Sequence, residues 1–183
     1  VIQLVQSGIE SVVASGGTAL TTNQIRLLHR FTEHITLLYD GDKAGIKAAI
    51  RGIDMMLEEG LNVRIILLPE GEDPDSFAKT HNASDLQAFL DNNTQDFIRF
   101  KTQLLSEDAQ NDPTKRSEMI LQIVRSIAVI PDVIKRQVYI KDTAALLAIP
   151  EDVLTRKVTE IRQNEAEERN KKKDLDQRKQ NET

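Results

Sequence analysis

The sequence contains no cysteine, and this absence removes several kinds of site at once. A disulfide framework, a cysteine nucleophile, a thiolate zinc site and an iron–sulfur cluster all require cysteine, so none of them can be built from these 183 residues. The lack of cysteine also suits a reducing compartment, and we expect the protein to be cytoplasmic.

Long apolar runs and an excess of positive charge are missing as well. No stretch approaches the roughly 20 apolar residues of a membrane-spanning helix, so we expect a soluble protein with no membrane partner. Lysine and arginine total 24 against 29 acidic residues, a net charge of −5. Any binding of nucleic acid must therefore use a local patch. Because the chain begins at Val1 without a signal-peptide pattern, we interpret it as an internal fragment of a longer protein.

The first 80 residues alternate short apolar runs with helical patterns. We predict buried strands at Ile9–Ala14, Ile35–Tyr39 and Val63–Leu68. One helix between them begins at a Thr21-Thr22 cap, and another runs from about Ala44 to Glu59. Strands separated by helices in this way are typical of crossover connections in a parallel sheet.

After Asp73-Pro74-Asp75 the strand signals end and the patterns become helical. Helices are predicted over five segments: Ser84–Leu90, Thr94–Leu105, Thr114–Ile130, Val133–Leu147 and Glu151 to about Ile161. The predicted fold class is α/β followed by all-α, a partial parallel sheet with crossover helices and then a small helical bundle. We divide the chain into residues 1–80, residues 81–160 and a charged tail, residues 161–183, which is either a solvated single helix or a disordered linker.

Two aspartates separated by a glycine form the densest chemical signal. Asp40-Gly41-Asp42 follows a predicted buried strand, and a helix follows at once. Ligand sites in open α/β sheets lie at these carboxyl ends of strands, and Gly41 lets both carboxylates converge on one point. A hard divalent ion accepts a few carboxylates and keeps waters or substrate phosphates as its other ligands. The alternative is that one aspartate caps the following helix.

A second acidic pair, Asp73-Pro74-Asp75, follows the next predicted strand. In a parallel sheet the ends of both strands lie at one edge, so these acids could hold a second ion beside the first. Such a pair of ions clamps the attacking and leaving oxygens in phosphoryl transfer. The alternative for Asp73 is a helix cap with Pro74 at the first helical position.

A glycine-rich turn follows the first predicted strand. In Ser15-Gly16-Gly17-Thr18, the backbone N–H groups of Gly16, Gly17 and Thr18 could bind a phosphate or nucleotide. The spacing matches no Walker or Rossmann fingerprint, so a plain tight turn is the competing interpretation.

Four blocks in order carry a resemblance to a known family. They are Gly8-Ile9, Ala14-Ser15-Gly16-Gly17-Thr18-Ala19-Leu20, Tyr39-Asp40-Gly41-Asp42-Lys43-Ala44-Gly45 and Leu67-Leu68-Pro69-Glu70-Gly71-Glu72-Asp73-Pro74-Asp75. The run from Val1 to about Lys79 resembles the later part of a TOPRIM domain, more narrowly that of bacterial DnaG-type primases. The helical stretch to about residue 160 resembles the helical subdomain that closes the primase catalytic core.

The resemblance implies that the full-length protein is a DNA-directed RNA polymerase. Such a primase makes short RNA primers on a single-stranded DNA template from ribonucleoside triphosphates, by metal-dependent nucleotidyl transfer during replication. By the same resemblance, Asp40, Asp42, Asp73 and Asp75 match the acidic positions that bind Mg²⁺ or Mn²⁺, with Asp40 and Asp42 as the catalytic pair. It also implies a zinc-binding domain and a carboxyl-terminal domain that binds the replicative helicase, both outside this sequence.

The resemblance also has departures. The family's TOPRIM domain begins with a strand that ends in a glutamate, and this chain starts after that point. The basic amino-terminal subdomain, which carries much of the template-binding surface, is outside the sequence too. We therefore expect the isolated chain to be inactive.

Three other functions remain open from the residues. A topoisomerase or nuclease would use the same acids but needs a tyrosine nucleophile or another domain, and Tyr39 and Tyr139 have no catalytic context. A phosphohydrolase would use Asp40 as a covalent nucleophile, although Lys43 and Ala44 depart from what such enzymes carry. In a non-enzymatic interaction module, the helical bundle would bind a partner and the acids would be vestigial.

Overall fold

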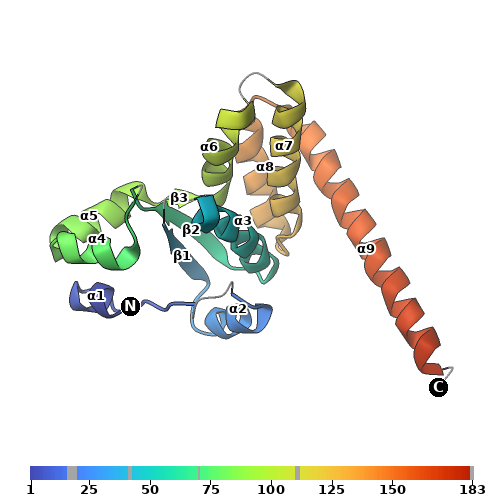
Figure 1. Cartoon of the computed structure of the whole chain (residues 1–183). Helices are drawn as coiled ribbons and strands as arrows, with labels where there is room; N and C mark the ends of the chain where they lie inside the picture. Colours follow the sequence, from blue (N-terminus) through green and yellow to red (C-terminus); the bar gives the residue numbers. More distant parts are fainter. Residues whose placement is uncertain (16–19, 41–42, 70, 110–111, 182–183) are drawn as a thin grey trace.

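The computed structural model describes residues 1–15, 20–40, 43–69, 71–109 and 112–181. Figure 1 shows its elements, which are α1 (Ile2–Gln6), α2 (Thr22–His29), β1 (His34–Tyr39), α3 (Lys43–Glu58), β2 (Asn62–Leu67), α4 (Pro74–Thr80), α5 (Ala83–Asn93), β3 (Gln95–Asp96), α6 (Phe97–Ala109), α7 (Pro113–Ala128), α8 (Val133–Leu147) and α9 (Glu151–Asn181). The predicted class, α/β followed by all-α, is confirmed.

The sheet has three strands in the order β1-β2-β3. β1 and β2 run parallel and in register from His34↔Asn62 to Tyr39↔Leu67, and α3 connects them. Two of the predicted strands and their crossover helix are therefore confirmed. β3 pairs antiparallel with β2 over two residues, which makes the sheet mixed and was not predicted.

The predicted strand at Ile9–Ala14 is wrong, because residues 9–15 form neither a strand nor a helix. The Val12 N–H donates to the Glu10 carbonyl at 3.0 Å, which closes a tight turn inside the segment. Ile9 and Val12 pack against a small apolar cluster, whereas Val13 is 69% exposed. The apolar run thus covers neighbouring helices as a loop, without the backbone partners that a buried strand needs.

One large apolar cluster joins the sheet to the helices that follow it. One face of β1 and β2 supplies Leu37, Val63 and Ile65, and α3 covers that face with Ile53 and Met56. The same cluster continues into α6, α7, α8 and α9, through the side chains Phe97, Phe100, Ile123, Ile127, Ile140, Leu154 and Val158. The two halves of the chain therefore share a core, although the division at residue 80 stays a prediction.

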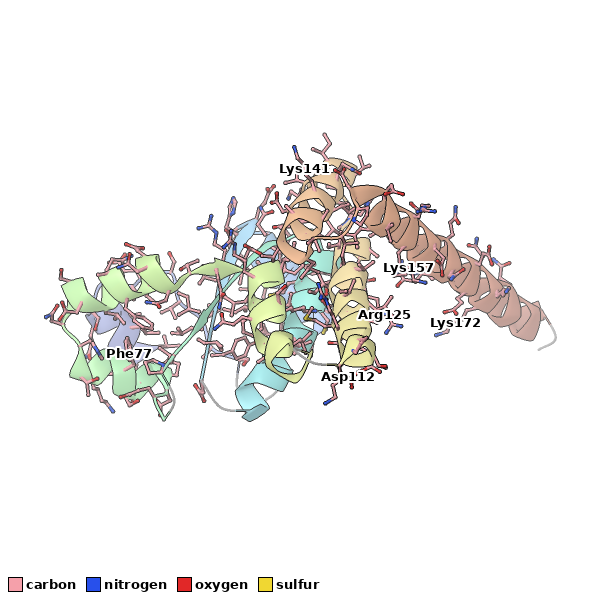
Figure 2. The ribbon with its side chains drawn as sticks, turned by 90° about the horizontal axis from the view of Figure 1, so that it is seen from above. Phe77, Asp112, Arg125, Lys141, Lys157 and Lys172 are labelled. Atoms are coloured by element: carbon pink, nitrogen blue, oxygen red, sulfur yellow. The ribbon has the colours of Figure 1, made fainter. Side chains whose placement is uncertain are left out.

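A smaller cluster lies on the other side of the sheet. Leu4 of α1 packs with Leu68, Phe77 and Leu86, so that α1, α4 and α5 form one group (Figure 2 labels Phe77 within it). These three helices stand apart from α6–α9 in Figure 1. α4 follows β2 along the chain, and its N-cap, Asp73, comes six residues after the end of that strand.

A buried lysine connects three helices in the large core. Lys101 of α6 is 1% exposed, and its Nζ donates to Asp54 Oδ1 of α3 at 2.8 Å and to Ser126 Oγ of α7 at 2.5 Å. The partners of this lysine were not predicted from the sequence. Because a buried ammonium needs hydrogen-bond partners, this contact ties α3 to the bundle.

The charged tail is helical. The sequence allowed two interpretations of this tail, a solvated helix and a disordered linker. Residues 161–181 continue α9 without a break and extend away from the bundle (Figure 1). Arg169 on this helix pairs with Glu58 at the end of α3, with 2.8 Å between Nη2 and Oε1. Among the described helices, none has the length and apolar character that a membrane crossing requires.

Candidate metal-binding site at the carboxyl edge of the sheet

The parallel strands β1 and β2 end at the same edge of the sheet, and the two predicted acidic segments follow these ends along the chain. Tyr39 pairs with Leu67 in the parallel register, and the Leu68 N–H donates to the Tyr39 carbonyl at 3.0 Å. The ladder therefore extends to the point where Asp40 begins. Asp40 is exposed at this edge, and α3 starts three residues later at Lys43. Asp42, the other half of the predicted pair, lies outside the described residues.

The segment after β2 turns tightly before it reaches the second pair. The Glu72 N–H donates to the Pro69 carbonyl at 3.1 Å, and Gly71 has a φ of +85°. Glycine is favoured at such a position because a Cβ strains the left-handed region. The turn delivers Asp73 to the start of α4, close along the chain to the end of β2.

Asp73 is the N-cap of α4, as the competing interpretation predicted. Its Oδ1 accepts from the backbone N–H groups of Asp75 and Ser76, both at 2.8 Å. The Ser76 Oγ accepts in return from the Asp73 N–H at 3.0 Å, which completes a capping box. The backbone N–H of Ser76, and after it that of Asp75, lower the pKa of the Asp73 carboxyl below its ordinary value by donating to it. Both cap bonds end on Oδ1, and a carboxylate has a second oxygen that can serve a metal ion.

The capping role predicts an acid-sensitive contribution to stability. Because the pKa of Asp73 is lowered on folding, its contribution is present above the ordinary pKa of 3.8 and is lost as the pH falls through the folded value. Asp73→Asn keeps an oxygen acceptor but removes the titration. We expect wild type to melt at a higher temperature than this variant at pH 5, and the difference to shrink towards pH 2.

Asp91→Asn is the matched control, since the exposed Asp91 of α5 accepts from the Gln87 side chain within the helix. We expect this variant to keep a constant offset from wild type across the same thermal melts. A constant offset for Asp73→Asn as well would contradict the linkage to the cap.

Asp75 already has a cationic partner. Its Oδ2 lies 2.5 Å from the Nζ of Lys79, one turn further along α4, and both side chains are more than half exposed. The carboxylate raises the pKa of Lys79 above its ordinary value, by hydrogen bonding and by charge attraction. A metal ion at Asp75 would have to compete with this lysine.

The donor chemistry at this edge fits a hard divalent ion. Asp40, Asp73 and Asp75 offer carboxylate oxygens, which Mg²⁺ and Mn²⁺ prefer over nitrogen and sulfur ligands. Within the described ranges, no group of three or more histidine, cysteine or acidic side chains is already gathered for a metal. The assignment of Asp40, Asp42, Asp73 and Asp75 as metal ligands therefore stays a prediction. The phosphate-binding prediction for Gly16, Gly17 and Thr18 falls on residues outside the described ranges.

Both tyrosines are partly buried in this fold. Burial raises the pKa of Tyr39 and that of Tyr139, which disfavours the phenolate that a covalent mechanism would use. The Tyr139 ring also packs edge-on against Phe97, with 4.8 Å between ring centroids. Neither environment favours the tyrosine nucleophile that the topoisomerase alternative would need from this chain.

Three polar residues beside the acids were not predicted from the sequence. The Ser76 Oγ donates to Glu72 Oε2 at 2.5 Å, and Lys79 holds Asp75. Sequence signals for both contacts exist: Asp73 and Ser76 have capping-box spacing, and Asp75 and Lys79 have the i, i+4 spacing of helical ion pairs.

Comparison with known proteins supports the resemblance in both halves of the chain. Residues 1–78 match the family described as Toprim-like. A curated relative, the DNA primase of Clostridium acetobutylicum, is 34% identical over 156 residues, which is 84% of this chain and 26% of that protein. The chain thus spans about a quarter of the length of the curated relatives it matches.

Solved structures show the same similarity in three dimensions. A DNA primase domain from Pseudomonas aeruginosa gives a TM-score of 0.73 at 27% identity, over 86% of this chain and 50% of that one. The Aquifex aeolicus primase, solved with its zinc-binding and RNA polymerase domains, gives 0.67 at 32% identity, over 82% of this chain and 36% of that one. A DnaG primase catalytic domain bound to single-stranded DNA gives a TM-score of 0.68 at 27% identity, over 79% of this chain and 47% of that one.

Proposed function

We propose that this chain, which is similar over most of its length to the catalytic cores of DnaG-type DNA primases, supplies the later TOPRIM region and the helical bundle of such a core. In the longer protein it would take part in the synthesis of short RNA primers on single-stranded DNA. The reaction class is nucleotidyl transfer from ribonucleoside triphosphates to a growing RNA end.

One observation carries this proposal. The two parallel strands end together, and the exposed Asp40 and the α4 cap Asp73 follow those ends in a chain whose similarity to primase cores extends from the sheet through the bundle. Carboxylates at this edge of an α/β sheet are where a phosphate-bearing substrate with its metal ions would bind. A primase relative bound to single-stranded DNA supports the choice of template.

The acids act as two pairs in the proposed site. Asp40 and Asp42 would hold Mg²⁺ or Mn²⁺ from the loop between β1 and α3, and Asp73 and Asp75 would serve a second ion from the start of α4. When bound, such ions neutralise triphosphate charge and polarise the reacting phosphoryl oxygens. The Asp73 cap fixes where that carboxylate sits, because two backbone N–H groups hold its Oδ1.

The proposed partners follow from the same assignment. The template is single-stranded DNA, the substrates are ribonucleoside triphosphates, and the replicative helicase would bind through a carboxyl-terminal domain outside these residues. Zinc would belong to another domain of the longer protein, as in the relative solved with a zinc-binding domain. The proposed location is the bacterial cytoplasm, where replication takes place.

We expect the 183-residue chain alone to make no primers. It spans 26% of its curated relative, and loss of part of a cooperating catalytic set can cost as much as loss of the whole set. The measurement is extension of labelled ribonucleotides on single-stranded DNA with Mg²⁺ or Mn²⁺.

A chimeric primase provides the positive arm. In the chimera, the matched segment of the chain replaces the corresponding segment of the Clostridium acetobutylicum primase, and we expect the chimera to make primers. A folded chimera without primer synthesis would count against the proposed function, and template-dependent synthesis by the isolated chain would contradict the expected inactivity.

A further inference from the structure

A groove of about 390 Å³ runs between α8 and α9, and its lining includes none of the predicted metal ligands. Polar side chains form much of its lining, with Gln137 of α8 and Thr155, Thr159 and Gln163 of α9. Val133, Ile140 and Val158 add an apolar part. A volume of this size lies within the range of small-molecule sites in proteins.

Two arginines from different helices meet in this groove. Arg136 of α8 donates through Nη1 to the Ile130 carbonyl at 2.6 Å and to the Pro131 carbonyl at 2.7 Å. Arg162 of α9 donates through Nη1 to the Ala128 carbonyl at 2.5 Å and also reaches the Ile130 carbonyl at 3.3 Å. Because both guanidiniums reach the carbonyl of Ile130, the contacts hold two positive charges close together.

Hydrogen bonds to carbonyls fix these guanidiniums without neutralising them. Each carries five N–H donors, and the contacts with the end of α7 use Nη1 alone, so Nε and Nη2 offer further donors. Burial and the positive charge of Arg162 lower the pKa of Arg136, and Asp132 opposes this effect. Asp132 also serves as the N-cap of α8, where its Oδ1 accepts from the Lys135 N–H at 2.7 Å.

Two neighbouring carboxylates, Glu151 and Glu58, have other contacts, and a third, Glu165, lines a second cavity together with Arg162. Glu151 accepts from the Gln137 side chain at 2.8 Å, and Glu58 pairs with Arg169 at 2.8 Å. Two fixed arginines in a groove with hydroxyl and amide side chains match the chemistry that recognises phosphate, because guanidinium donors suit its oxygens in geometry and in charge.

We propose that the α8–α9 groove binds a phosphate group, with Arg136 and Arg162 as its charged ligands and Gln163 as a polar ligand at its rim. The phosphate comes from a free nucleotide or from the backbone of a nucleic acid. The site is separate from the acidic edge of the sheet, and it does not depend on the proposed primase function.

The test measures binding of phosphate compounds to the 183-residue chain by calorimetry at low salt. Four probes are titrated separately: inorganic phosphate, ATP without metal, an oligonucleotide of eight thymidines, and a tetraglutamate peptide. We expect binding of at least one phosphate probe, and a loss of about tenfold or more in affinity for Gln163→Glu, since the new carboxylate occupies the arginine donors.

Gln163→Glu leaves the arginine contacts with the end of α7 in place, so the variant is expected to fold as wild type does. Asn170→Asp, the same amide-to-acid change further along α9 at an exposed position outside the groove lining, should bind as wild type does. Arg162→Gln should also lose binding, and its folding is checked by thermal melting.

The probes distinguish the two sources of phosphate. Binding of ATP or inorganic phosphate that exceeds oligonucleotide binding would identify a free nucleotide or phosphate site, and the reverse would identify a nucleic-acid backbone site. Absence of binding by all three phosphate probes, equal binding by Gln163→Glu and wild type, or tighter binding of tetraglutamate would each overturn the proposal.

Discussion

Asp40→Asn in the chimeric primase is expected to slow primer synthesis about a hundredfold or more, and Asp42→Asn to do the same. Asparagine keeps the size of the side chain and removes the anionic oxygen that a hard cation prefers. The lost metal charge would otherwise stabilise the transition state, and removal of one comparable electrostatic group costs about two to three orders of magnitude in other enzymes. Asp75→Asn should be nearly as severe if a second ion is used, and Asp73→Asn milder, because asparagine remains a good cap.

The measurement is the rate of primer synthesis on single-stranded DNA across a Mg²⁺ and a Mn²⁺ titration. Thermal melting of each variant checks the fold. A higher metal concentration should recover part of the lost rate if the substitutions weaken metal binding, whereas a loss that ignores metal concentration points to another role for the acids.

Lys171→Ala and His29→Ala are controls outside the predicted site. Lys171 is exposed on α9, and His29 ends α2. We expect both variants to stay within about a factor of three of the wild-type rate, as ordinary surface substitutions do. Wild-type rates for both Asp40→Asn and Asp42→Asn would refute the metal assignment, and the similarity to primases would be unaffected.

Local patterns were sufficient to predict most of the helices and the parallel pair of strands. The helix predicted over Val133–Leu147 has the bounds of α8, and Thr21 caps α2 through a box with Gln24. Such features depend on residues three or four positions apart, so a single sequence contains them. The parallel strand ends also followed from the spacing of strands and helices.

Features that depend on distant partners were not predicted correctly. An apolar run such as Ile9–Ala14 fits a strand or a packed loop equally well, and only a pairing partner decides between them. β3 has two residues and exists because β2 offers it an edge. The polar partners of Lys101 come from helices 47 and 25 positions away in the chain, beyond the reach of any local pattern.

For the candidate site, the sequence predicted the location better than the roles. Asp73 had two competing roles on sequence grounds, and the backbone hydrogen bonds establish the capping role while leaving a carboxylate oxygen for metal. Asp75 is predicted as a ligand, and in the structure it pairs with Lys79, at the i, i+4 spacing of helical ion pairs that the sequence also contains. Conversely, the groove arginines Arg136 and Arg162 had no sequence motif to mark them.

The buried lysine gives the second large expected effect, and it concerns the contact between α3 and the bundle. Asp54→Ala should lower the free energy of unfolding by about 3 kcal/mol. The substitution removes the anionic partner of the Lys101 ammonium, whose side chain is 1% exposed, and leaves it the neutral hydroxyl of Ser126. Lys101→Met should cost less, within about 1.5 kcal/mol, since methionine fills a similar apolar volume. Asp54 is 39% exposed and can be hydrated after the lysine is removed.

Urea unfolding of the 183-residue chain measures these differences, with Asp91→Ala as an exposed control expected to stay within about 0.5 kcal/mol of wild type. The decisive protein is the double variant with Asp54→Ala and Lys101→Met. If an uncompensated buried charge causes the loss in Asp54→Ala, removing that charge restores stability, and the double variant should unfold near the Lys101→Met single variant. Additive losses would show instead that Asp54 stabilises α3 independently of Lys101, and the contact would then not tie the helix that follows the Asp40 loop to the bundle.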